Sequence, residues 1–179
     1  ILISLIFYLK YFNNNHKISE QNEIPEIADD DQNNSSTYIK NMDYNSYDAK
    51  GNRYEITAKV AEIRIENPDL MFLTNVIAHV FIKDSNTVKI TSNFGEYNSK
   101  NYDTIFLENV IVVYPGHKIT GENLDFSFLS NLGIFTTNVI YNGNKTNLFA
   151  DKIEMDLKTK DMKIFMDDVN KKVLVKKAK

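Results

Sequence analysis

The chain has 179 residues, a formal net charge of −3 at pH 7 and no cysteine. That length suits one sizeable domain with appendages, and the lack of cysteine excludes disulfides and thiolate chemistry. Acidic residues gather between residues 13 and 45, so the rest of the chain is close to neutral and lacks the basic field that nucleic-acid binding requires.

The first segment, residues 1–12, is predicted to be part of a membrane anchor. Residues 1–9 are apolar apart from one serine and one tyrosine, and Lys10, Tyr11 and Phe12 follow. A full span needs roughly 20 apolar residues, and the chain begins with Ile, so we expect a transmembrane helix with a truncated N-terminus. No small-residue cleavage site follows, and an aromatic and basic border suits a membrane interface. An anchor is therefore favoured over a signal peptide or a buried strand.

Residues 13–46 are predicted to be a disordered acidic spacer. They are mostly Asn, Ser, Gln, Asp and Glu, and such a composition buries too little apolar surface to order the chain. The acidic run at residues 29–31 is interpreted as a solvated tether and not as a metal site. No cofactor is expected.

From Tyr47 onward, short segments alternate apolar and polar residues, which is typical of β-strands. One motif recurs there: an aliphatic residue, a Phe, two variable residues, Asn or Asp, and Val. Its four copies are residues 71–76, 105–110, 134–139 and 164–169. A spacing of about 30 residues indicates a stacked repeat fold.

A small residue precedes each copy of the motif, at Ala58, Ser92, Gly121 and Ala150. We expect each copy to supply a strand, a corner at the small residue, a second strand, a turn and a third strand. One copy cannot bury its apolar face alone, whereas four stacked copies can. The predicted fold is all-β: an antiparallel β-jellyroll over residues 47–179, with two facing sheets that form an open trough, preceded by the N-terminal membrane helix.

The motifs of common enzymes are missing. The sequence contains no GxxxxGK[ST], HExxH or GxSxG pattern, and the histidines at 16, 79 and 117 lie far apart. Paired carboxylates such as Asp167 and Asp168 are explained by turns or outward-facing positions of the repeat. We therefore expect no catalytic residue, no metal site and no enzymatic activity.

Segments 48–59, 70–76, 90–97 and 107–110 are similar, in order and spacing, to the OstA-like family that includes LptA, LptC and the N-terminal part of LptD. With its anchor and spacer, the layout most resembles LptC. The resemblance implies a single-pass protein of the cell inner membrane whose β-jellyroll lies in the periplasm. It also implies that lipopolysaccharide is accepted from an LptBFG-like ABC transporter and passed to an LptA-like periplasmic bridge protein.

Two sets of residues are predicted to carry this function. A trough for acyl chains would be lined by apolar and small side chains: Ile56, Ala58, Ala61, Ile63, Ile90, Tyr97, Ile119, Gly121, Leu124, Phe126, Ile153 and Met155. Unpaired strand edges at the two ends of the stack would receive partners. The predicted edge residues are Tyr54 and Ile56 for the transporter, and Val169, Val173 and Val175 for the bridge protein.

Two other classes stay open at this point. One is an envelope scaffold or adhesion domain with a filled core, because large apolar residues in a stacked sheet are often plain core. The other is a hydrolase that acts on envelope sugars.

Overall fold

The computed structural model describes residues 35–47, 51–83, 85–168 and 170–177. The predicted anchor, residues 1–12, and most of the predicted spacer lie outside these ranges. Within the described ranges, no helix is long and apolar enough to cross a membrane.

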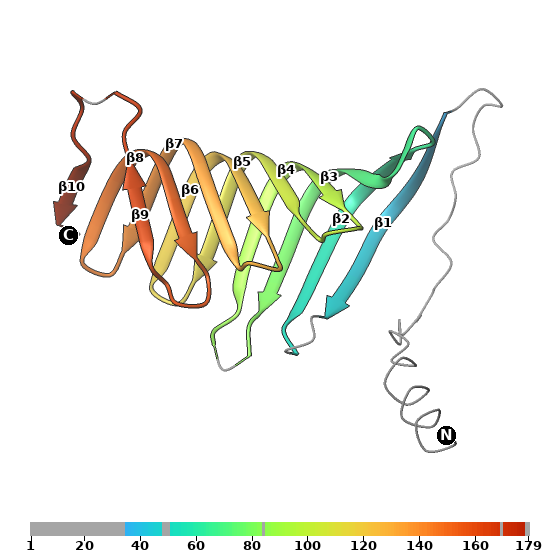
Figure 1. Ribbon diagram of the computed structural model, residues 1–179, viewed down its shortest axis with the longest axis horizontal. Helices are drawn as coiled ribbons and strands as arrows, with labels where there is room; N and C mark the ends of the chain where they lie inside the picture. The colour runs from blue at the N-terminus through green and yellow to red at the C-terminus, as the bar shows by residue number, and fades with distance from the viewer. Residues whose placement is uncertain (1–34, 48–50, 84, 169, 178–179) are drawn as a thin grey trace, which may run out of the picture.

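The described residues form one antiparallel sheet of ten strands (Figure 1). The strands follow one another across the sheet in chain order up to β8, which pairs with both β9 and β10. This confirms the all-β antiparallel prediction, although the sheet is continuous and not split into two. The strands are β1 Ser36–Tyr47, β2 Arg53–Arg64, β3 Asn67–Phe81, β4 Val88–Asn98, β5 Thr104–Tyr114, β6 His117–Ser127, β7 Leu132–Gly143, β8 Thr146–Asp156, β9 Met162–Phe165 and β10 Leu174–Lys177.

Strand β1 corrects the predicted spacer, because its residues 36–46 are ordered. The strand pairs with β2 along its whole length and buries Met42 and Ser46. It is the first strand of the sheet, so its other side chains are mostly exposed and polar, as an edge strand allows. That polarity made the segment look like solvated linker in the sequence.

Most strands bend halfway along their length. The asparagine that recurs in the repeat explains how the backbone bends. Asn75, Asn109 and Asn138 have φ angles of 54°, 51° and 56°. This left-handed conformation is strained for most L-residues, but asparagine tolerates it. The pairing register shifts beside the bends between β4 and β5, β5 and β6, β6 and β7, and β7 and β8. The Asn of the motif therefore marks the bend of β3, β5 and β7.

The small residues lie at the same bends, in the even-numbered strands. Val76 pairs with Ser92, Val110 with Gly121, and Ala150 with Val139. The predicted corner between two short strands is therefore a bend inside one long strand. Each copy of the repeat is a hairpin of two bent strands and not a group of three.

The repeat extends further at one end of the chain and breaks at the other. In β1, Tyr38 and Met42 flank a bend at Asn41, whose φ is 50°. Asn41 precedes Asn75 by the same number of residues by which Asn75 precedes Asn109. In the last copy, β9 ends at Phe165 and β10 pairs with the first half of β8 instead.

The bends fold the sheet over into two layers. Figure 1 shows the strands arching along one margin of the molecule, with many of the hairpin loops on the opposite margin. We call layer one the strand halves next to the loops at residues 65–66, 99–103, 128–131 and 157–161. Layer two comprises the strand halves at the opposite ends of the strands, where β1 ends and β2 begins, β3 ends and β4 begins, β5 ends and β6 begins, and β7 ends and β8 begins, together with β10.

The two layers face each other with an offset of about three strands. Tyr44 in layer two of β1 contacts Tyr97 in layer one of β4, with ring centroids 5.1 Å apart. Likewise the hydroxyl of Tyr54 in β2 lies 2.9 Å from the Thr104 hydroxyl in β5. Layer one of β1 to β3 and layer two of β7, β8 and β10 therefore extend past the facing layer. We call these two regions the overhangs.

Candidate functional site

The predicted lipid-binding residues lie together on the inner face of the folded sheet. All of them are buried except Ile63, which is partly buried. The register explains this, because side chains alternate along each strand and paired residues share a face. Rows such as Ile56, Ala78, Ile90, Val112 and Ile119 cross the sheet at one level. Contact of these residues with lipid stays a prediction.

Between the layers, the middle of the interior is filled by side chains. Ile56, Ile119 and Ile153 each have 0% of their surface exposed, and Phe126 has 2%. Aromatic rings supply much of the contact: Tyr54 of layer two packs against Phe126 and Phe128 of layer one, at centroid distances of 5.7 and 5.5 Å. The predicted trough is thus closed at its centre.

A few polar groups are buried in this apolar interior. The hydroxyls of Tyr54 and Thr104 form a hydrogen bond across the layers, and both residues are 0% exposed. Burial raises the pKa of Tyr54 and Tyr97 above the ordinary value for tyrosine. Among the described residues, the buried hydroxyls of Ser46 and Tyr97 have no hydrogen-bond partner of normal geometry.

Both overhangs leave part of the inner face uncovered. At the first end, Ile39, Ile63 and Met71 occupy inward positions but are only partly buried. At the last end, Val175 pairs with the buried Leu148 and is 59% exposed. The inner apolar face therefore continues from the closed centre to partly exposed side chains at the β1 end and to the exposed Val175 at the β10 end.

The sheet edges differ in part from the prediction. Tyr54 and Ile56 belong to β2, which is paired with β1 on one side and β3 on the other, so they are not at an edge. The edge at that end is β1. At the other end Val175 lies in the edge strand β10, Val173 precedes it and is partly buried, and Val169 lies outside the described residues.

Two hollows are prominent, and both open outside the interior. One of about 330 Å³ lies over β1 to β5, with Tyr38, Phe72, Phe94 and Glu96 among its lining residues. The other, of about 610 Å³, lies where the loops after β5 and β7 meet. Within the described ranges, no group of three or more His, Asp or Glu is placed to hold a metal ion.

Sequence reasoning missed two features of this site. Strand β1 was detectable from the aromatic residue at 38, Asn41 and Met42, which repeat the spacing of the later copies. The cluster of Tyr114, His117 and Tyr141 was not detectable, because a turn and a strand pairing bring these rings together. His117 alone in the sequence gave no signal.

Comparison with known proteins gives a family. No curated protein matches the chain significantly. The profile of the family described as lipopolysaccharide-assembly, LptC-related, matches residues 1–168, which is most of the chain. That range contains residues 1–12, strands β1 to β9, the first three copies of the repeat and all but the last residue of the fourth. The chain therefore belongs to the LptC-related family of lipopolysaccharide-assembly proteins.

Proposed function

We propose that this protein is a non-catalytic carrier that holds the acyl chains of lipopolysaccharide between the two layers of its folded sheet. It accepts the lipid from an ABC transporter of the inner membrane and passes it to a soluble bridge protein in the periplasm. A helix at residues 1–12 anchors it in the inner membrane, with the sheet in the periplasm.

One observation carries the proposal: the inner apolar face runs the whole length of the sheet, from the partly exposed Ile39, Ile63 and Met71 at the first end to the exposed Val175 at the last. A domain with only a structural core gains nothing from leaving that core open at two opposite ends. A carrier needs one opening for the arriving lipid and another for the departing lipid. Membership of the lipopolysaccharide-assembly family gives the class of lipid.

The energetics favour enclosure of the lipid. Burial of one methylene is worth about 0.8 kcal/mol, so one acyl chain of a dozen carbons gains about 10 kcal/mol by leaving water. Because the centre is filled, an entering chain has to part the two layers or displace side chains there. The aromatic contacts of Tyr54 with Phe126 and Phe128 are the ones that must give way. A partner protein drives this movement, as an ABC transporter does with ATP.

The direction of transfer follows from the two edges. We assign the β1 edge to the membrane transporter, because β1 lies nearest in the chain to the anchor region. The β10 edge is assigned to the bridge protein. Both edge strands have unpaired backbone groups on one side, which strand addition by a partner would satisfy.

Photocrosslinking to lipid in cells tests the carrier function. A photoreactive residue at Phe126 or Ile63, on the inner face, is expected to form an adduct with lipopolysaccharide. Asp125 and Glu62 are matched controls, because each is the neighbour in the same strand and faces outward. Adducts at all four positions, or at none, would contradict the proposal.

A second set of crosslinks tests the two edges. A photoreactive residue at Tyr44 in β1 should capture the membrane transporter, and one at Val175 in β10 should capture the soluble bridge protein. The opposite pattern would reverse the direction of transfer while leaving the carrier function intact.

A scaffold with a filled core is the second candidate, and the buried centre favours it. Uptake of a fluorescent fatty acid by the purified protein separates the two functions. A carrier takes up the probe with saturation, and uptake falls when a bulky residue replaces Ala58 or Ala61 on the inner face. A scaffold takes up none.

A further inference from the structure

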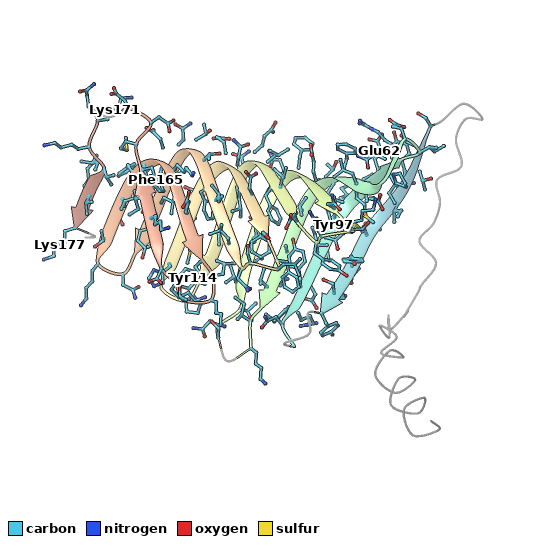
Figure 2. All side chains as sticks on the ribbon, in the orientation of Figure 1. Glu62, Tyr97, Tyr114, Phe165, Lys171 and Lys177 are labelled. Carbon is cyan, nitrogen blue, oxygen red and sulfur yellow. The ribbon has the colours of Figure 1, made fainter. Side chains whose placement is uncertain are left out.

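The smaller of the two hollows lies on the outer face of layer one, towards the β1 end of the sheet. It has a volume of about 330 Å³, and we call it the outer hollow. Figure 2 shows one of its lining residues, Glu62, at this end of the molecule. Most of its lining side chains point outward, in two neighbouring rows of the register: Tyr38, Glu62, Phe72 and Glu96 in the first, and Val60, Thr74, Phe94 and Leu107 in the second.

One cation of the chain already binds beside the outer hollow. The guanidinium carbon of Arg64 lies 4.2 Å from the centre of the Phe72 ring, and its Nε donates a hydrogen bond to Glu62 at 3.0 Å. The hydrogen bond from Arg64, with a second from the Ser36 hydroxyl, lowers the pKa of Glu62 below its ordinary value. We call such a group a cation triad: an acid, a cation two residues away in the same strand, and a Phe of the neighbouring strand.

The cation triad recurs elsewhere on the outer face. One further triad joins β2 to β3 and the other joins β8 to β9; their members are Arg53, Glu55 and Phe81, and Lys152, Glu154 and Phe165. The guanidinium carbon of the first lies 3.9 Å from its ring centre, and the ammonium nitrogen of the second lies 5.2 Å from its own. The chain contains only two arginines, so both of its guanidinium groups are held in this way.

Glu96 has the acid and the rings of a triad, but the chain places no cation beside it. It pairs directly with Phe72 of β3, and Phe94 of its own strand faces the same side. The positions two residues before and after the acid, which supply the cation in the other triads, are Phe94 and Asn98 here. Among the described residues, none forms an ion pair with Glu96. A cation from outside the chain would complete this triad.

The lining of the outer hollow suits a guanidinium on an apolar stem. The side chains of Tyr38 and Phe94 are 37% and 43% exposed, so their rings are accessible from solvent. The face of an aromatic ring attracts a cation, and a guanidinium can stack on the ring while its N–H groups donate to a carboxylate. Val60 and Leu107 offer apolar contact to the methylene groups of an arginine.

The arginine has to come from a different protein. A second copy of the chain cannot supply it, because both of its arginines are held in its own triads. The outward row of the hollow continues across layer one with further acidic residues, Asp125 and Glu154, which attract a basic segment. One wall of the hollow is Tyr38 of the edge strand β1, so a protein that docks at this edge can also reach the hollow.

We propose that the outer hollow binds an arginine side chain of a partner protein, namely the one that docks at the β1 edge. The guanidinium stacks on Phe94 and donates hydrogen bonds to Glu96, in the way that Arg64 is held in its own triad. The identity of the partner rests on the proposed function of the β1 edge, whereas the arginine site does not depend on it.

The first test titrates the full chain with the tripeptide acetyl-Leu-Arg-Leu-amide, followed by NMR. The backbone amide signals of Thr74, Phe94 and Glu96 should shift and reach saturation. The same peptide with citrulline in place of arginine has a similar shape without the charge, and it should bind at least about threefold more weakly. If the arginine peptide shifts none of these signals, or if the two peptides bind equally, the inference is wrong.

A pair of isosteric variants separates the triad from general attraction by acidic residues. Glu96→Gln should weaken binding of the arginine peptide at least about threefold. Asp125→Asn is the control, because it removes the same charge from the same row, where its neighbours Ile105 and Ile134 are not aromatic. It should change the affinity by less than about twofold. Equal losses in the two variants would overturn the inference.

A second pair of variants fills the outer hollow from within the chain. Thr74 faces outward and pairs with Phe94, so Thr74→Arg supplies a guanidinium at the hollow and should abolish saturable binding of the peptide. Thr136→Arg adds the same charge in the same row at β7, and it should leave the affinity within about twofold. If Thr74→Arg binds the peptide as tightly as the original chain, the hollow is not the binding site.

The last test identifies the source of the cation. Vesicles of phosphatidylethanolamine present a primary ammonium group on a lipid; if they shift the signals of the hollow and the arginine peptide does not, the assignment to a protein is wrong. In cells, Glu96→Gln should lower the yield of the crosslink from Tyr44 to the partner at the β1 edge, and Asp125→Asn should not. An unchanged yield would refute this partner while the peptide titration upholds the arginine site. If Tyr44 captures no protein, the edge assignment fails and the titration still decides whether the hollow binds arginine.

Discussion

The hydrogen bond between Tyr54 and Thr104 gives a direct test of how the two layers close. It joins β2 in layer two to β5 in layer one at 2.9 Å, and both side chains are 0% exposed. Tyr54→Phe leaves the Thr104 hydroxyl buried without a partner, which should lower the free energy of unfolding by about 1–3 kcal/mol. Thr104→Val leaves the Tyr54 hydroxyl unpaired and should cost a similar amount.

The double variant is the decisive measurement. It removes both polar atoms, so it should cost less than the sum of the single variants, with a coupling energy of about 1 kcal/mol or more. Urea unfolding measures each free energy. The m-value, which is the slope of the unfolding free energy against urea concentration, should be the same for all variants. Tyr47→Phe, at a tyrosine that is 60% exposed, is the control and should stay within about 0.5 kcal/mol. If the cost of the double variant equals the sum of the two single-variant costs within about 0.5 kcal/mol, the closed arrangement of the layers is refuted.

Three further predictions concern the bends, the loops and the buried tyrosines. Asn75→Val should lower the free energy of unfolding by about 1–2 kcal/mol, because valine is strained at a φ of 54°, whereas Asn75→Gly should change it little; urea midpoints compare the two. Gly143→Ala should break the bond between the Tyr141 hydroxyl and the nearby imidazole, because the new Cβ would lie 2.6 Å from that hydroxyl; an unchanged imidazole NMR signal would contradict this. Burial raises the pKa of Tyr54 and Tyr97 in the folded protein. Their contribution to the free energy of unfolding should therefore be constant up to the ordinary tyrosine pKa of 10.0 and fall as the pH rises above it. Absorbance at about 295 nm should show that these two tyrosines ionise only on unfolding.

The fold class could be predicted from the sequence because the repeat has a fixed spacing and its residues alternate between apolar and polar. Alternation gave the strands, and the recurring Asn at 75, 109 and 138 marked a fixed position in each copy. The small residues at 58, 92, 121 and 150 were misinterpreted, however, since the predicted corner between two strands and the observed bend within one strand look alike in sequence. The distinction depends on whether the pairing with the neighbouring strand continues past the bend, which only the register shows.

Features that depend on tertiary contacts could not be predicted. The offset between the layers is set by contacts such as Tyr44 with Tyr97, residues of β1 and β4 that no local pattern connects. The early edge was misplaced by one strand because β1 carries few apolar residues and resembles a linker. The residues predicted to line the trough do lie on the inner face, since burial follows directly from alternation once the strands are known, while their contact with lipid stays a prediction.

The offset of the layers has a geometric consequence for assembly. At the β1 end, layer one projects beyond layer two, and at the β10 end, layer two projects beyond layer one. These two ends are complementary in shape, because the layer that projects at one end is the layer that is recessed at the other. A second sheet folded with the same offset would extend both layers at once, so that the seam in one layer is always covered by unbroken strands of the other. An apolar passage built in this way would have no point along its length at which its contents meet water on both sides.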